Sequence, residues 1–67
     1  MKRIDYDFIK NRRESKGLSM QYVAQELGFK NASTYFKYEI GEYLMKADML
    51  PKLSQLFECK IENFFTD

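Results

Sequence analysis

SMQYVAQELGFKNASTYFKY, residues 19–38, holds the signals of two short helices joined by a tight corner. Ser19 is a good N-cap, and the residues after it place apolar side chains at helical spacing. Gly28 ends that helix, because glycine readily takes the positive φ angles that a corner requires. Asn31 can cap a second helix. These signals predict helices over residues 20–27 and 32–40.

The length of the corner decides which side chains of the second helix face inward. With the usual spacing between two such helices, Thr34 and Lys37 would occupy the inner sites, which burial disfavours. One additional residue in the corner places Tyr35 and Tyr38 there instead. We therefore predict a lengthened corner through Phe29, Lys30 and Asn31.

Helical spacing continues on both sides of this segment, so the whole chain is predicted to be helical. Pro51 is tolerated in a first turn, which sets the start of the fourth helix. The remaining helices are expected at residues 5–16, from residue 47 or 48 to 57, and at 61–65, the last as a short helix or 3₁₀ turn. Inward side chains are expected from Phe8, Ile9, Leu50, Leu53, Leu56, Phe57, Ile61, Phe64 and Phe65. The predicted fold class is an all-α, five-helix domain over residues 1–67.

Length and composition exclude several classes of protein. A chain of 67 residues can hold one small domain, which buries only about 60% of its unfolded surface. With one cysteine and no histidine, the usual zinc, haem and triad chemistries lack their commonest ligand and base. We therefore expect no catalytic residue, metal, cofactor or small-molecule ligand. No apolar run approaches the roughly 18 residues of a membrane span, so a cytoplasmic protein without membrane contact is expected.

The charges are distributed unevenly along the chain. Residues 1–37 carry eight Lys or Arg and four Asp or Glu, a net charge of +4, whereas residues 38–67 carry three and six, a net charge of −3. A positive half suits a polyanion as ligand. The same charges can equally serve to solvate one helix, and charge alone leaves both interpretations open.

Four stretches of the chain together follow the order and spacing of one known family. They are IKNRRESKGLS (9–19), VAQELG (23–28), STYFKYE (33–39) and LSQLFECKIENFF (53–65). These stretches resemble the phage repressor and Cro-like helix-turn-helix family, also called Xre-like. The resemblance implies a helix-turn-helix at about residues 20–40, whose third helix enters the major groove of double-stranded DNA. It also implies a transcriptional regulator that is not an enzyme and that binds an inverted-repeat operator as a homodimer.

The resemblance assigns roles to individual positions. The base-reading positions it implies are Asn31, Ala32, Ser33, Phe36 and Lys37. The phosphate contacts it implies are Lys10, Gln21, Lys30 and Lys46. A structural ion pair is implied between Arg13 and Glu39. The dimer interface is expected to include Tyr43, Leu44, Met45, Phe64 and Phe65.

The expected base-reading set contains few strong bidentate readers. Lys37 can donate to guanine, and Ser33 can bond to several bases. Either Asn31 reads adenine, or part of the specificity comes from DNA shape. Met20 stands where the family commonly has a phosphate-clamping glutamine, so either Gln21 substitutes for it or the contact is absent.

A second function class fits part of the sequence. The acidic second half, the apolar residues 43–45 and the weak base-reading set favour a helix-turn-helix fold used as a protein-interaction module, such as an antirepressor or adaptor. Such a module would not read DNA. Salt dependence separates the two classes, because DNA binding weakens steeply as salt rises.

Overall fold

The structure is a computed structural model that describes residues 2–67, and it confirms the all-helical prediction. The helical elements are α1 (Tyr6–Ser15), α2 (Met20–Glu26), α3 (Ala32–Glu39), the 3₁₀ turn η1 (Ala47–Met49), α4 (Leu50–Phe57) and the 3₁₀ turn η2 (Ile61–Phe64). Two strands of two residues each complete the fold, β1 (Arg3–Ile4) and β2 (Phe65–Thr66).

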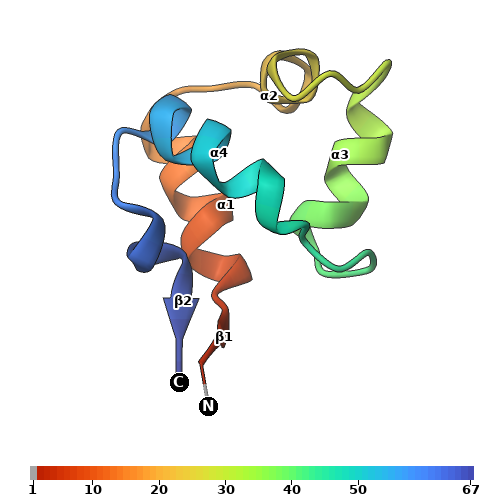
Figure 1. The fold of residues 1–67 in the computed structure, drawn as a ribbon. Coiled ribbons are helices and arrows are strands. Elements are labelled where there is room, and N and C mark those ends of the chain that lie inside the picture. Colours follow the sequence, from red (N-terminus) through yellow and green to blue (C-terminus); the bar gives the residue numbers. More distant parts are fainter. Residues whose placement is uncertain (1) are drawn as a thin grey trace.

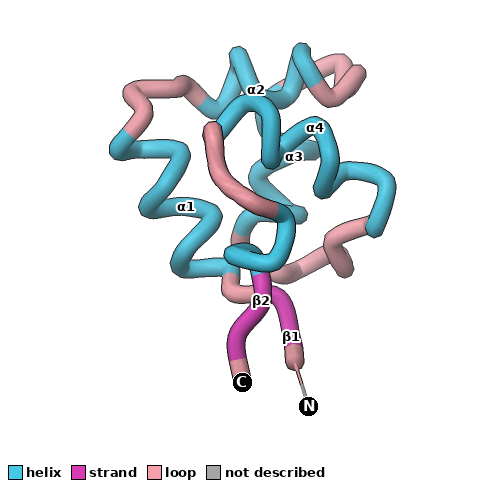
Figure 2. Tube along the Cα trace, turned by 60° about the vertical axis from the view of Figure 1, so that its left-hand side comes forward, coloured by secondary structure: helices cyan, strands magenta, loops and turns pink. Residues whose placement is uncertain are grey.

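The helices lie at different distances from the two termini. α2 and α3 lie at the end opposite both termini, and α1 and α4 lie between them and the strands (Figure 1). The two strands lie side by side and carry both termini away from the helices in the same direction (Figure 2). Helix α3 therefore stands at the periphery, away from the ends of the chain.

The predicted helix caps are present at both helices of the central segment. The Ser19 hydroxyl accepts a hydrogen bond from the Tyr22 amide at 3.0 Å at the start of α2. The Asn31 side chain accepts one from the Thr34 amide at 3.1 Å at the start of α3. Gly28 has a φ of +89° at the corner. Local capping and a left-handed glycine thus set the bounds of both helices.

The register predicted for α3 is confirmed. Tyr35 and Tyr38 are both buried in the core, whereas Phe36 between them is exposed. The Tyr38 ring stacks on Phe29 of the corner with a centroid distance of 5.4 Å. The residue added to the corner therefore turns the two tyrosines inward, as burial of their rings requires.

The end of the chain differs from the prediction. Residues 61–65 were expected as one helical segment, but the 3₁₀ turn ends at Phe64 and Phe65 enters β2. There Phe65 pairs with Ile4, Thr66 pairs with Arg3, and the Asp5 amide donates to the Phe64 carbonyl at 2.7 Å. Pairing between opposite ends of a chain leaves no local sequence signal, so this ribbon was not predicted.

Two residues near the C-terminus are placed differently from the expectation. Phe64 is fully buried, with its ring edge-on to Phe8 and Phe57 at centroid distances of 5.9 and 6.2 Å. It therefore cannot line a dimer interface, and that assignment is wrong. Ile61 was expected to face inward but is exposed. Side chains three residues apart in a 3₁₀ turn point the same way, so the period of the turn does not explain the exposure of Ile61, which stands at the first position of η2.

Basic residues of α1 tie that helix to its neighbours. Arg13 pairs with Glu39 at the end of α3 through two hydrogen bonds of 2.8 and 3.1 Å, and this bonding raises the pKa of Arg13. Arg12 donates to the Phe57 carbonyl at 2.9 Å and to the Glu58 carbonyl at 3.0 Å, where α4 ends. Lys16 donates to the Glu58 carboxylate at 2.6 Å. Three basic side chains therefore make their contacts within the fold.

Candidate nucleic-acid interface

Helix α3 presents one continuous outward stripe. Because its tyrosines face the core, Ser33, Phe36 and Lys37 lie on the other side of the helix, with Ala32 half-buried at the first turn. Phe36 is 42% exposed, and Ile40, four residues later, is 51% exposed. The stripe therefore combines a hydroxyl, an ammonium group and two apolar side chains. Ile40 was not among the predicted site residues, although its helical spacing from Phe36 is a signal that could have identified it.

Asn31 is engaged by its own helix. Its side-chain carbonyl oxygen accepts from the Thr34 amide at 3.1 Å, from the Thr34 hydroxyl at 3.0 Å and from the Ser33 hydroxyl at 2.7 Å. A bidentate contact to adenine needs both the carbonyl oxygen and the amide group of asparagine. With the oxygen occupied by the cap, Asn31 has its amide N–H donors left for a ligand.

Lys37 lies over an aromatic ring. Its Nζ is 5.4 Å from the centroid of Tyr43, in the loop that follows α3, and the Lys37 carbonyl accepts a hydrogen bond of 3.1 Å from the Tyr43 amide. A cation over a ring face is attracted by the negative face of the ring. Tyr43, predicted at a dimer interface, is thus a neighbour of the outward stripe of α3.

The predicted phosphate contacts come from four separate parts of the fold. Lys10 lies on α1, Gln21 on α2, Lys30 in the corner and Lys46 in the loop before η1. All four are exposed, and none makes a side-chain hydrogen bond or ion pair within residues 2–67. They are therefore available to an external anion.

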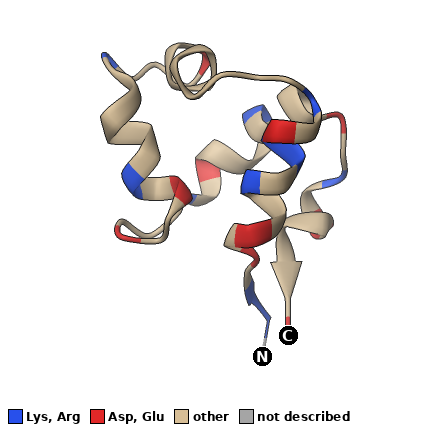
Figure 3. Cartoon of the chain, turned by 180° about the vertical axis from the view of Figure 1, so that it is seen from behind, with Lys and Arg blue, Asp and Glu red and all other residues tan. Residues whose placement is uncertain are grey.

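The basic first half of the chain does not form a single basic face. Arg12, Arg13 and Lys16 are bonded within the fold, as described above. Basic and acidic positions are intermixed along the ribbon, and most of α3 carries neither (Figure 3). Part of the positive charge of the first half is thus used inside the fold, in the ion pairs Arg13–Glu39 and Lys16–Glu58 and in the bonds of Arg12 to carbonyls.

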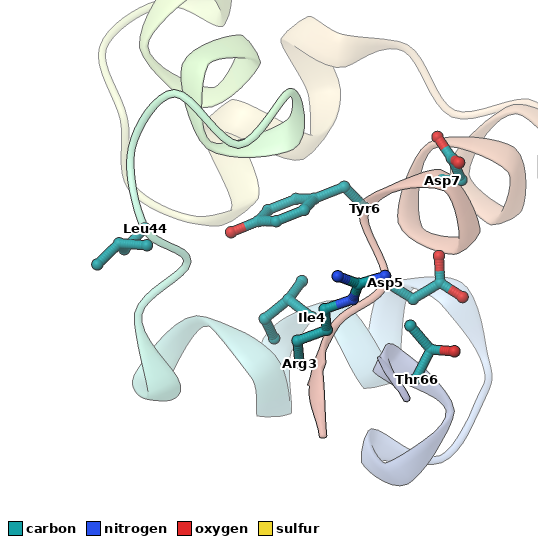
Figure 4. A pocket seen from close by; sticks show the side chains of 7 residues that line it. All are labelled: Arg3, Ile4, Asp5, Tyr6, Asp7, Leu44 and Thr66. Carbon is teal, nitrogen blue, oxygen red and sulfur yellow. The ribbon is translucent and has the colours of Figure 1, made fainter. Parts of the chain in front are cut away.

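The loop after α3 exposes apolar surface. Leu44 is 84% exposed, Tyr43 is also exposed, and Met45 and Phe65 are half-buried. Leu44 borders an open pocket with residues of the N-terminal segment and β2, and the Tyr6 hydroxyl points toward the loop (Figure 4). The pocket is lined by Arg3, Ile4, Asp5, Tyr6, Asp7, Leu44 and Thr66.

No helix among residues 2–67 has the length and apolar character needed to cross a membrane. Within the same residues, no group of three or more His, Cys, Asp or Glu side chains is arranged to hold a metal ion.

One family of known proteins matches the sequence of this chain. A family model described as helix-turn-helix matches residues 9–64, from α1 through η2. Neither a curated protein nor a solved structure matches the chain.

Proposed function

Because the chain belongs, over residues 9–64, to the Cro-like (Xre-like) helix-turn-helix family of DNA-binding regulators, we propose that it is a sequence-specific transcriptional regulator of double-stranded DNA. By occupying a promoter, the protein would repress transcription. It would do so without catalysis and without a small-molecule effector. With DNA as its ligand, the protein would act in the cytoplasm.

The observation that carries this proposal is the orientation of α3. Its tyrosines are buried and its Ser33, Phe36 and Lys37 side is left free, at the end of the molecule opposite the termini (Figure 1). A helix with a free polar and apolar side fits the major groove of B-DNA, where base edges present donors, acceptors and thymine methyl groups.

Each position on this side suits a different base feature. The Lys37 ammonium can donate to guanine, and the Ser33 hydroxyl can accept from a base while it donates to Asn31. Ala32 and Phe36 can contact thymine methyl groups. Asn31 would contribute through its amide donors alone. Because no side chain of this set offers a complete bidentate pair, part of the specificity would come from DNA shape.

The four free polar residues outside α3 would position the protein on the backbone. Lys10, Gln21, Lys30 and Lys46 would contact phosphates, which set register without selecting sequence. Three lysine contacts per subunit predict a slope of log K against log salt of about −3 for one subunit and about −5 for a two-fold dimer. Affinity for random DNA would be correspondingly modest.

A two-fold dimer would place two α3 helices on one face of the DNA. Their centres would be about 34 Å apart, and the operator would be an inverted repeat. The exposed Leu44, with Tyr43, Met45 and Phe65 nearby, supplies apolar surface for the contact between subunits.

Selection of bound duplexes from a random DNA pool tests the proposal. We expect enrichment of an inverted repeat, and Lys37→Ala should then weaken binding to that repeat by about 1–3 kcal/mol more than binding to random DNA. Lys10→Ala is the matched control, since loss of a phosphate contact should weaken both equally. If no duplex is enriched above random sequence, sequence-specific DNA binding is excluded.

One observation favours the protein-interaction alternative. Phe36 and Ile40 form an exposed apolar pair on the same side of α3, and Leu44 in the following loop is also exposed. Apolar surface of this kind also suits a partner protein. Affinity measured between 50 and 200 mM salt separates the functions, because a largely apolar protein interface should be nearly insensitive to salt in this range.

A further inference from the structure

The contact between Lys37 and Tyr43 leaves the lysine free to donate. Nζ lies 5.4 Å from the ring centroid, and Lys37 forms no side-chain hydrogen bond or ion pair among the described residues. A carboxylate partner would neutralise the ammonium and occupy its N–H groups. An aromatic face attracts the charge and leaves those donors available to a second partner.

Tyr43 is itself held in place from two directions. Its ring meets the buried Tyr38 edge-on, with a centroid distance of 5.3 Å and an interplanar angle of 74°, and Tyr38 in turn stacks on Phe29. Its backbone amide is bonded to the Lys37 carbonyl at 3.1 Å. A residue of the loop is therefore fixed against the core and against the end of α3.

We infer that Tyr43 is a positioning residue that holds the Lys37 ammonium in place for reading a base edge. The inference rests on the proposed function. A lysine side chain loses much rotamer freedom when it binds, and a ring that already restrains it in the free protein lowers that loss. Tyr43 would thus raise affinity for the cognate sequence by acting on Lys37, without a base contact of its own.

The first test needs no DNA, and its decisive measurement uses the wild-type protein. In the ¹H–¹³C spectrum of the full chain, the ring current of Tyr43 should shift the Lys37 ε-methylene protons upfield. Tyr43→Phe should retain this shift, because the aromatic face remains, and Tyr43→Leu should abolish it. An unshifted Lys37 signal in the wild-type protein would overturn the inference at once.

The second test measures affinity for the duplex recovered from the random pool and for a scrambled duplex of equal composition. The rotamer freedom that the ring would spare Lys37 on binding corresponds to about a two- to five-fold effect on affinity, within the cost of immobilising one such side chain. Tyr43→Leu should therefore lower affinity for the recovered duplex two- to five-fold and leave affinity for the scrambled duplex unchanged. Tyr43→Phe should bind like the wild type, and Tyr43→Leu should have no further effect in a Lys37→Met background. Tyr22→Leu is the matched control, since it makes the same substitution at an equally exposed tyrosine that has no assigned part in DNA binding or in the dimer.

The outcomes separate this inference from the proposed function. Suppose that the wild type binds the recovered duplex, but that Tyr43→Leu lowers affinity equally in the wild-type and Lys37→Met backgrounds. Tyr43 then acts independently of Lys37, and only the inference fails. An equal loss on both duplexes would likewise overturn it. If the wild type prefers no duplex, the proposed function fails and the role of Tyr43 in reading DNA fails with it, whereas the spectrum would still report the contact.

Discussion

Arg13 of α1 holds the carboxylate of Glu39, the last residue of α3, through parallel hydrogen bonds from Nε and Nη2, and both side chains are buried. Arg13 also donates to the Leu18 carbonyl at 2.9 Å, between α1 and α2. One guanidinium group therefore fixes the end of α3 relative to the first helix and the segment that leads into the second.

Breaking this pair on one side should be severely destabilising. Glu39→Met or Arg13→Met should lower the free energy of unfolding by about 3–5 kcal/mol, because each leaves a buried charge without its partner. The double variant Arg13→Met/Glu39→Met should lose clearly less than the sum of the single losses. Urea denaturation measures all three. Lys52→Met is the control, since the Lys52–Glu26 pair at 3.9 Å is partly exposed and its loss should cost below about 1 kcal/mol. Additive losses in the double variant would refute the coupling.

Replacing Tyr35 by phenylalanine should not destabilise the protein. Its hydroxyl is buried without a hydrogen-bond partner among the described residues, and burial together with the negative charge of Glu39 raises the pKa of Tyr35 far above its ordinary value. An unpartnered buried polar group is unfavourable by about 1–3 kcal/mol, so Tyr35→Phe should leave the free energy of unfolding unchanged or raise it within that range.

Two measurements check the environment of Tyr35. Absorbance titration at alkaline pH should show that Tyr35 ionises only when the protein unfolds. In urea denaturation, Tyr38→Phe serves as the comparison for loss of a tyrosine hydroxyl from the same helix. A loss of more than about 1 kcal/mol specific to Tyr35→Phe would mean that its hydroxyl is hydrogen-bonded in solution.

The Glu58 carboxyl should titrate below its ordinary range. The hydrogen bond from Lys16, and then the positive charge of that residue, lower the pKa of Glu58. A carboxyl with a lower pKa in the folded state favours folding above its unfolded pKa, and this contribution is lost as pH falls through the folded pKa. Titration by ¹³C NMR should show the lowered pKa in the wild type and its return upward in Lys16→Met. An equal pKa in both proteins would contradict the contact.

Substitution of Leu44 should affect assembly, whereas substitution of Phe64 should affect stability. Leu44→Lys should weaken the proposed dimer in sedimentation experiments and leave the free energy of unfolding of the monomer nearly unchanged, because Leu44 is largely exposed. Phe64→Ala should lower the free energy of unfolding by about 3–5 kcal/mol, since it empties a core site. A wild-type protein that remains monomeric at high micromolar concentration without DNA would argue against the dimer.

The sequence predicted the elements that depend on nearby residues. Ser19 and Asn31 cap helices through amides three residues away, and Gly28 turns the chain at one position. The inward register of Tyr35 and Tyr38 also follows from local spacing, because both lie on one side of the helix and burial favours them over Thr34 and Lys37. The occupied oxygen of Asn31 is equally local and could have been foreseen from the cap.

The sequence by itself determined the helical class, the lengthened corner and the outward side of α3, since each follows from contacts within a few residues. Four features depended on the tertiary structure. They are the pairing of the two strands, the burial of Phe64, the bonds of Arg12 and Lys16 to the end of α4, and the position of Lys37 over the Tyr43 ring. The first three join parts of the chain that are far apart in sequence, and the last depends on the path of a loop. The sequence does not show which residue a charged or aromatic side chain will contact, because that depends on which surfaces come together when the helices pack.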